Sequence, residues 1–274
     1  MIIWLASYPK SGNTWVRIFL NSLLFSNKEE VDINNIKIEQ FPNKKHFRNI
    51  STDLSNIKDI LENSINAQNF INIDKKIKFL KTHSANWKTD NSNFTDKINT
   101  HGVIHIVRDP RNVITSLKNH YSKNSYGETL EFMKDEKKFI GSKKMETEFD
   151  IPTLISSWSN HYNSWKKFDK NYLLIKYEDL LYKKNEFFKI TTFLEKNTKN
   201  KFTNDQIDKA LNDCSFKNLK QQEMEKGFIE APKSKNQNFF YLGPENNWKK
   251  FLDSETTKEI ESYFEIEMKE LNYL

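Results

Sequence analysis

The sequence predicts an α/β fold, a single three-layer domain over residues 1–274 with a central parallel sheet. The first observation is a strand–loop–helix unit over residues 2–24, where an unbroken apolar run precedes a polar loop and apolar residues at helical spacing. The second is that further short apolar runs end in polar residues, at 77–80, 102–107 and 172–177. Apolar strands that alternate with amphipathic helices are typical of a parallel sheet covered on both faces.

The composition of the chain limits the classes of protein to which it can belong. The 274 residues carry a net charge of +6, from 43 basic and 37 acidic residues interspersed along the chain, which suits a small anionic ligand better than nucleic acid. The one cysteine, Cys214, excludes an intramolecular disulfide and a cysteine-cluster metal site. No apolar run is long enough for a membrane span, and the chain enters its first strand without a signal peptide. We therefore expect a cytoplasmic protein.

The loop over residues 7–13 has the features of an anion site. A strand, a short loop and a helix in this order bring unpaired backbone N–H groups and the positive end of the helix dipole together. Lys10 adds an ammonium group, and Ser11 and Thr14 add hydroxyl donors. Gly12 is one of only 6 glycines in the chain, so its place in this loop favours a phosphate-binding loop over an ordinary turn that holds a lysine.

The order of residues in the loop differs from that of nucleotide hydrolases, G-x-x-x-x-G-K-[ST], because Lys10 and Ser11 precede the glycine and Trp15 opens the helix. The string YPKSGNTW at residues 8–15 closely resembles the 5′-phosphosulfate loop of sulfotransferases that use 3′-phosphoadenosine 5′-phosphosulfate (PAPS). The resemblance implies a fold like that of P-loop nucleoside triphosphatases, PAPS as donor, its product PAP, and no metal. It also implies that the donor is bound by Lys10, Ser11, Gly12, Asn13, Thr14 and Trp15.

A histidine follows the run at 77–80. His83 comes just past the end of a predicted parallel strand, where open α/β sheets place ligand-facing residues, and Lys81 shares that edge. A lone histidine is usually structural or simply exposed. The string LKTH matches the sulfotransferase segment that supplies the catalytic histidine, so the resemblance implies that His83 is the general base and Lys81 an accompanying catalytic cation, beside Lys10.

A second spacing points to the 3′-phosphate of the donor. Arg108 ends the run at 102–107, and Asp109-Pro110 is a good helix start because Asp caps helices and Pro suits their first position. The family's 3′-phosphate motif is Arg at a strand end with Ser eight residues later, which here are Arg108 and Ser116. The structural alternatives to phosphate binding are that Arg108 forms an ion pair with a neighbouring carboxylate and that the Ser116 hydroxyl lies on the surface of a helix.

By the same resemblance, Tyr177 contacts the adenine side of the donor, and Phe216 stacks on adenine opposite Trp15. The chain departs from the family near its end. Tyr241-Leu242 stand where the family has the Arg-Lys of its Arg-Lys-Gly contact to the 3′-phosphate. We expect Lys233 or Lys235, a few residues upstream, to compensate.

Other segments are less informative. Residues 26–56 read as loop with short helical pieces, and residues 122–150 as either a lid over the acceptor pocket or a solvated excursion without clear periodicity. Pro152 is expected to open an amphipathic helix. Its aromatic stripe is expected to be core: Ile155, Trp158, Tyr162 and Trp165.

The resulting hypothesis is that the protein transfers a sulfuryl group from PAPS to a small-molecule or glycan acceptor. The accepting group is expected to be a hydroxyl, with an amine as second choice. A homodimer is left open, and no nucleic-acid partner is expected. The first rival is a P-loop kinase or hydrolase, for which Asp109 would have to help hold Mg²⁺. The second is a basic RNA-binding protein, but no basic stripe or aromatic platform motif is evident.

Overall fold

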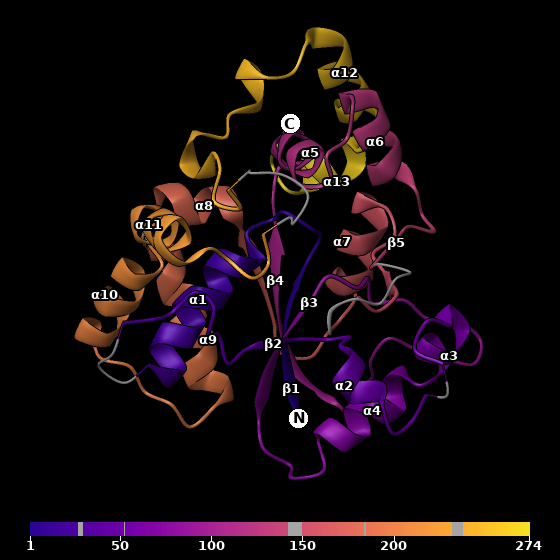
Figure 1. The fold of residues 1–274 in the computed structure, drawn as a ribbon, viewed down its shortest axis with the longest axis vertical. Helices are drawn as coiled ribbons and strands as arrows, with labels where there is room; N and C mark the ends of the chain where they lie inside the picture. Colours follow the sequence, from indigo (N-terminus) through magenta and orange to yellow (C-terminus); the bar gives the residue numbers. More distant parts are fainter. Residues whose placement is uncertain (27–29, 52, 142–149, 184, 232–237) are drawn as a thin grey trace.

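The computed structural model describes residues 1–26, 30–51, 53–141, 150–183, 185–231 and 238–274. At its centre lies a parallel sheet of five strands, which confirms the predicted fold class (Figure 1). Their order across the sheet is β2 (Glu39–Gln40), β3 (Lys78–Thr82), β1 (Ile2–Ser7), β4 (Thr100–Val107) and β7 (Tyr172–Lys176). The N-terminal strand β1 is therefore central, and the carboxyl ends of all five strands point to one edge.

Helices cover both faces of the sheet (Figure 1). One face carries α1 (Asn13–Phe25), α8 (Tyr177–Tyr182), α9 (Asn185–Asn197), α10 (Asn204–Asp213) and α11 (Phe216–Lys226). The other carries α2 (Lys44–Phe47), α3 (Ile57–Glu62), α4 (Ser64–Ile71), α5 (Pro110–His120), α6 (Tyr126–Lys134), α7 (Trp158–Lys166), α12 (Ser254–Tyr263) and α13 (Glu265–Glu270). A small antiparallel pair, β5 (Phe139–Ile140) with β6 (Thr153–Leu154), and two 3₁₀ turns, Gly243–Glu245 and Trp248–Lys250, complete the described elements. Among the described residues, no helix has both the length and the apolar character that crossing a membrane requires.

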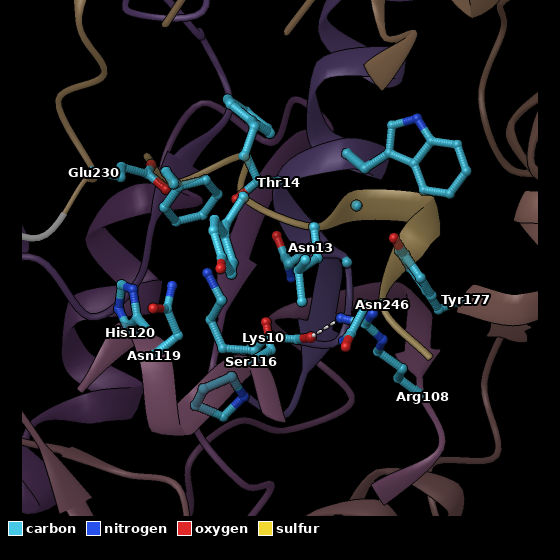
Figure 2. A pocket seen from close by; sticks show the side chains of 18 of the residues that line it. Lys10, Asn13, Thr14, Arg108, Ser116, Asn119, His120, Tyr177, Glu230 and Asn246 are labelled. Atoms are coloured by element: carbon cyan, nitrogen blue, oxygen red, sulfur yellow. Dashed lines mark hydrogen bonds between the residues drawn. The ribbon is translucent and has the colours of Figure 1, made fainter. Parts of the chain in front are cut away.

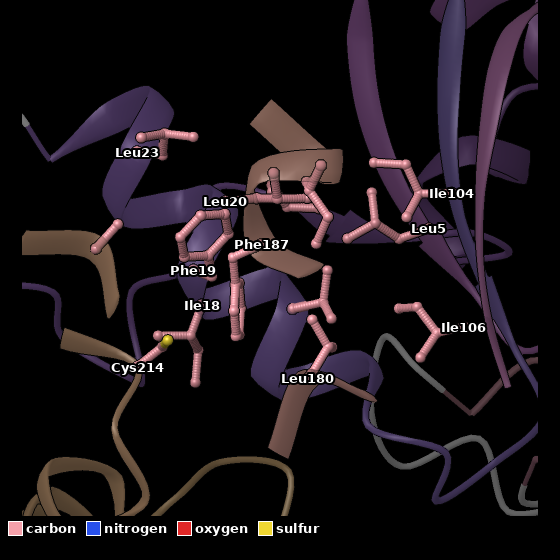
Figure 3. Close-up of a cluster of buried hydrophobic side chains, with 14 of the residues drawn as sticks. Leu5, Ile18, Phe19, Leu20, Leu23, Ile104, Ile106, Leu180, Phe187 and Cys214 are labelled. Atoms are coloured by element: carbon pink, nitrogen blue, oxygen red, sulfur yellow. The ribbon is translucent and has the colours of Figure 1, made fainter. Parts of the chain in front are cut away.

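Successive residues of β1 point to opposite faces, so this one strand anchors two cores. Ile3 and Leu5 join the core under α1, where apolar side chains of α1 meet Leu180 and Phe187 (Figure 3). Trp4 enters the other core, and its ring packs 5.2 Å from that of Phe94. Because β1 is fixed on both faces, the loop that leaves its carboxyl end starts from a rigid position.

The structure corrects the expected helix start at Pro152. The chain forms β6 first, and α7 begins only at Trp158, because Ser156 adopts a positive φ of 61° and Ser157 caps the helix by accepting the Asn160 N–H. The stripe is core as predicted, since Ile155 and the rings of α7 that follow it are buried.

Residues 122–150 contain more structure than their sequence indicated. Ser125 caps α6, which buries Leu130 and Met133 against α5. The short length of α6 and the Lys and Glu residues around it hid this pattern. The lid alternative depends on residues 142–149, which lie outside the described part.

Helix caps account for several other boundaries. The predicted cap at Asp109 is present, and Thr203 with Gln206 forms a capping box at the start of α10. Asp253 caps α12 by accepting the Thr256 N–H, and Phe264 separates α12 from α13.

Gly12 forms the turn between β1 and α1. Its φ of 101° lies in the region that favours glycine, and it is the residue that precedes α1. A Cβ atom here would stand 2.5 Å from the Tyr177 ring, at the start of α8. Two helices thus approach each other through a residue without a side chain.

We predict that Gly12→Ala destabilises the protein by about 1–2 kcal/mol through its backbone alone, with the clash against Tyr177 adding to that loss. Urea unfolding measures the difference. Gly127→Ala is the matched control, because Gly127 lies in α6 and a Cβ there meets only Ser125 Oγ at 3.8 Å. It should raise stability by about 0.5–1 kcal/mol. Equal effects of the two substitutions would contradict this account.

Candidate active site

A cavity of about 400 Å³ opens at the carboxyl edge of the sheet, where open α/β folds bind their ligands (Figure 2). The structure brings nearly all of the predicted site residues to it. The lining includes Lys10, Gly12, Asn13, Thr14, Trp15, Lys81, His83, Arg108, Ser116, Tyr177 and Phe216. Ser11 is the exception: it is buried in the loop and does not line the cavity.

Lys10 occupies the middle of the view in Figure 2. It adopts a left-handed backbone conformation, with φ 65°, and its Nζ lies 3.8 Å from the centre of the Phe239 ring. Burial, together with the positive charges of Arg108 and Lys81, lowers the pKa of Lys10 to about 7. An anion bound beside it would offset both effects, so the ammonium group favours a negatively charged ligand.

Two polar side chains of the loop have different roles. The Asn13 amide donates to Leu5 O at 2.9 Å and to Ser7 Oγ at 3.1 Å, so it shapes the turn. The Ser11 hydroxyl is buried and has no hydrogen-bond partner among the described residues. This hydroxyl does not reach the cavity, so the groups that the loop offers to a phosphate are Lys10, Thr14 and the backbone N–H groups at the start of α1. The loop therefore fits a phosphate group.

His83 faces the same cavity from the end of β3. Its Nδ1 lies 2.9 Å from Ser7 O. Because a carbonyl oxygen can only accept, Nδ1 carries the hydrogen, and the lone pair of Nε2 is left free. Burial, reinforced by the charge on Lys81, holds the pKa of His83 well below its usual value. The imidazole is thus a neutral ring with one basic nitrogen, which is the form a general base requires.

Arg108 makes no ion pair with a carboxylate among the described residues. Its Nη1 donates to Lys10 O at 3.0 Å, drawn as a dashed line in Figure 2, and its guanidinium lies 4.1 Å from the Tyr177 ring centre. Its Nε is buried without a described partner. Ser116, on α5, lines the same cavity. Their positions favour ligand contact over the structural alternatives considered for each residue.

The aromatic residues form a wall on one side of the cavity. The rings of Trp15 and Tyr177 meet edge to face at 5.5 Å. The Phe216 ring packs against Gly243, where a Cβ atom would stand 2.2 Å from it. This contact explains why the chain keeps the glycine of the family motif although Tyr241 and Leu242 replace the two cations before it. The expected compensation by Lys233 or Lys235 falls outside the described residues.

Sequence reasoning missed Glu230, which also lines the cavity. Its carboxylate forms ion pairs with Arg17 of α1 and with Lys81 Nζ, the latter at 3.2 Å. Glu230 stands in a segment without periodicity, far from both partners in sequence. The one available signal was Arg17, the single charged residue among the buried residues of α1.

Asp109, the residue that a magnesium-dependent rival would need, is already engaged. Its carboxylate caps α5 and forms an ion pair with Arg111 at 2.7 Å. Within the described ranges, His, Cys, Asp and Glu residues form no group of three or more that could hold a metal ion.

Two solved structures resemble this one in fold. The structure resembles a mouse sulfotransferase, SULT7A1, solved in complex with PAP, with 20% identity and a TM-score of 0.60 over 97% of this chain and 83% of that one. It also resembles a retinol dehydratase solved with retinol and PAP, with 18% identity and a TM-score of 0.63 over 98% of this chain and 81% of that one. At these identities the likeness shows the fold alone.

A search of the curated proteins found no match. The match to a family is direct, since residues 2–272 correspond to the sulfotransferase domain, in agreement with the resemblance carried by the loop at residues 8–15. The chain belongs to the sulfotransferase domain family and is an enzyme of that class.

Proposed function

We propose that this enzyme transfers the sulfuryl group of PAPS to a hydroxyl of a small-molecule or glycan acceptor, with an amine as second choice. One observation carries the proposal: the ammonium group of Lys10 and the basic nitrogen of His83 open on the same cavity from neighbouring strand ends. The first suits the leaving phosphate and the second suits the attacking hydroxyl. The solved neighbours complexed with PAP support the same donor.

The donor fits the cavity in three parts. The backbone N–H groups of the loop, with Lys10 and Thr14, hold the 5′-phosphosulfate at the start of α1. The adenine lies among Trp15, Tyr177 and Phe216. The 3′-phosphate takes a charge-assisted hydrogen bond from the Arg108 guanidinium and a second from Ser116.

The transfer follows from these positions. His83 Nε2 accepts the proton of the acceptor hydroxyl as its oxygen forms a bond to sulfur. The bond between sulfur and the bridging oxygen breaks, and its electron pair leaves on the 5′-phosphate of PAP. Lys10 stabilises this developing charge, and Lys81 adds positive charge beside it. Because the pKa of His83 lies well below 6.5, the base stays deprotonated throughout the neutral range.

The wider proposal is that residues 1–274 act as one catalytic domain in the cytoplasm, without nucleic acid. A homodimer is compatible with it.

Transfer of ³⁵S from labelled PAPS to a panel of phenols, alcohols, amines and sugars tests the proposed function. Label should appear in at least one acceptor class, and PAP should form in equal amount. ATP with Mg²⁺ is the parallel assay for the kinase alternative. Phosphoryl transfer from ATP without any sulfuryl transfer from PAPS would overturn the proposal.

His83→Ala should lower turnover by about 10²–10⁴-fold, because the attacking hydroxyl loses its general base. PAP affinity should change little, since the base contacts the proton and not the nucleotide. Turnover and calorimetric PAP affinity are measured on the same preparation. A parallel fall of both would instead place His83 in donor binding or in the fold.

Arg108→Ala should reduce the preference for PAP over AMP by about 10- to 100-fold, the value of a charge-assisted contact to the 3′-phosphate. The ratio of the two affinities is the measurement, because any change in the loop at Lys10 O affects both nucleotides alike. Ser116→Ala should lower the ratio less. An unchanged ratio in Arg108→Ala would remove this residue from the 3′-phosphate site. Lys233→Ala/Lys235→Ala tests the expected compensation in the same way.

A further inference from the structure

A carboxylate lies inside the cavity that is meant to receive a polyanionic donor. Glu230 is mostly buried, and one of its oxygens accepts from Arg17 while the other accepts from Lys81 Nζ at 3.2 Å. A negative charge at this place repels the donor, so it must serve another purpose.

Hydrogen bonds fix the backbone on both sides of this carboxylate. The Asn34 side chain holds the backbone on its N-terminal side, donating to Gly227 O at 3.0 Å and accepting the Ile229 N–H at 2.8 Å. The Ala231 N–H then closes a turn onto Phe228 O at 3.0 Å. Glu230 stands inside this anchored turn.

Its two cations come from different elements. Arg17 belongs to α1, one turn after the phosphate-binding loop, and Lys81 belongs to the end of β3, two residues before His83. Both are almost fully buried. Glu230 therefore links the helix of the donor loop to the strand that carries the base.

We propose that Glu230 is a positioning residue that holds the Lys81 ammonium group, in its charged form, beside the sulfuryl group being transferred. The inference rests on the proposed function, which gives Lys81 that place. Glu230 itself does not contact the substrate, because each of its carboxylate oxygens is already bound to a cation.

The charges around Lys81 support this assignment. The groups that face it are Glu230, Arg17, Lys10, His83 and His120. Burial lowers the pKa of Lys81 to about 8, Glu230 opposes that change, and Arg17 adds to it. Without Glu230, Lys81 would stand among Arg17, Lys10 and neutral imidazoles, and it would lose its proton at a lower pH.

Glu230→Gln tests the inference by NMR titration of the ligand-free enzyme labelled at lysine Cε, with the Lys81 signal assigned from Lys81→Ala. The pKa of Lys81 should fall by about one unit or more in Glu230→Gln, the usual effect of losing a nearby opposite charge. Glu225→Gln, at an exposed position on α11, is the matched control and should leave it unchanged. This readout needs no PAPS, so it stands even if the proposed function fails.

Turnover with the best acceptor of the panel gives the second readout. In Glu230→Gln, the alkaline limb of the profile of kcat against pH should move to lower pH by as much as the Lys81 pKa falls. In the Lys81→Ala background, Glu230→Gln should no longer move this limb. A loss of rate that is equal at every pH, or an unchanged Lys81 titration, would overturn the inference. If circular dichroism shows that Glu230→Gln does not fold, Glu230→Asp replaces it. Because the shorter Asp side chain places its carboxylate farther from Lys81, the Lys81 pKa should still fall below the wild-type value, and an unchanged pKa would contradict the proposal.

Discussion

Positive charge that has been removed from water is the constraint on which this site depends. Lys10, Lys81 and Arg108 converge on one cavity at the carboxyl edge of the sheet, and burial lowers the pKa of both lysines. Glu230 is committed to Lys81 and Arg17, so it leaves Lys10 and Arg108 without a carboxylate of their own in the described residues. A bound anion therefore removes an electrostatic penalty that the fold maintains.

The surrounding structure serves to hold that charge in place. Strand β1 is fixed in two cores, and Gly12 lets the loop turn sharply into α1. The Glu223 carboxylate on α11 accepts the backbone N–H of Phe240, at 2.9 Å, and that of Phe239, whose ring covers Lys10. The ring excludes water from the ammonium group on one side, which strengthens its attraction for phosphate.

The sequence predicted the parts of the site that lie within a few consecutive residues. The loop at 8–15, Lys81 with His83, and Arg108 with Ser116 each combine a strand end with a fixed spacing, so local pattern and position in the sheet agree. Glu230 and Phe239 escaped prediction because long-range contacts place them, in a segment without periodicity. The start of α7 was also mispredicted. Ile155 is buried like a residue of that helix, but the positive φ of Ser156 separates it from α7.

The affinity for PAP as a function of pH tests the central claim most directly. Lys10 in the ligand-free enzyme has a pKa of about 7, and a bound anion raises it, so above that pH binding must take up a proton. Wild-type affinity should then fall above about pH 7, by at most about tenfold per pH unit. Lys10→Arg, which stays charged throughout, should lose the fall that begins near pH 7 and keep only the titrations of PAP itself and of Lys81, whose pKa is about 8. Identical pH profiles for the two proteins would contradict the claim that desolvated charge on Lys10 organises the site.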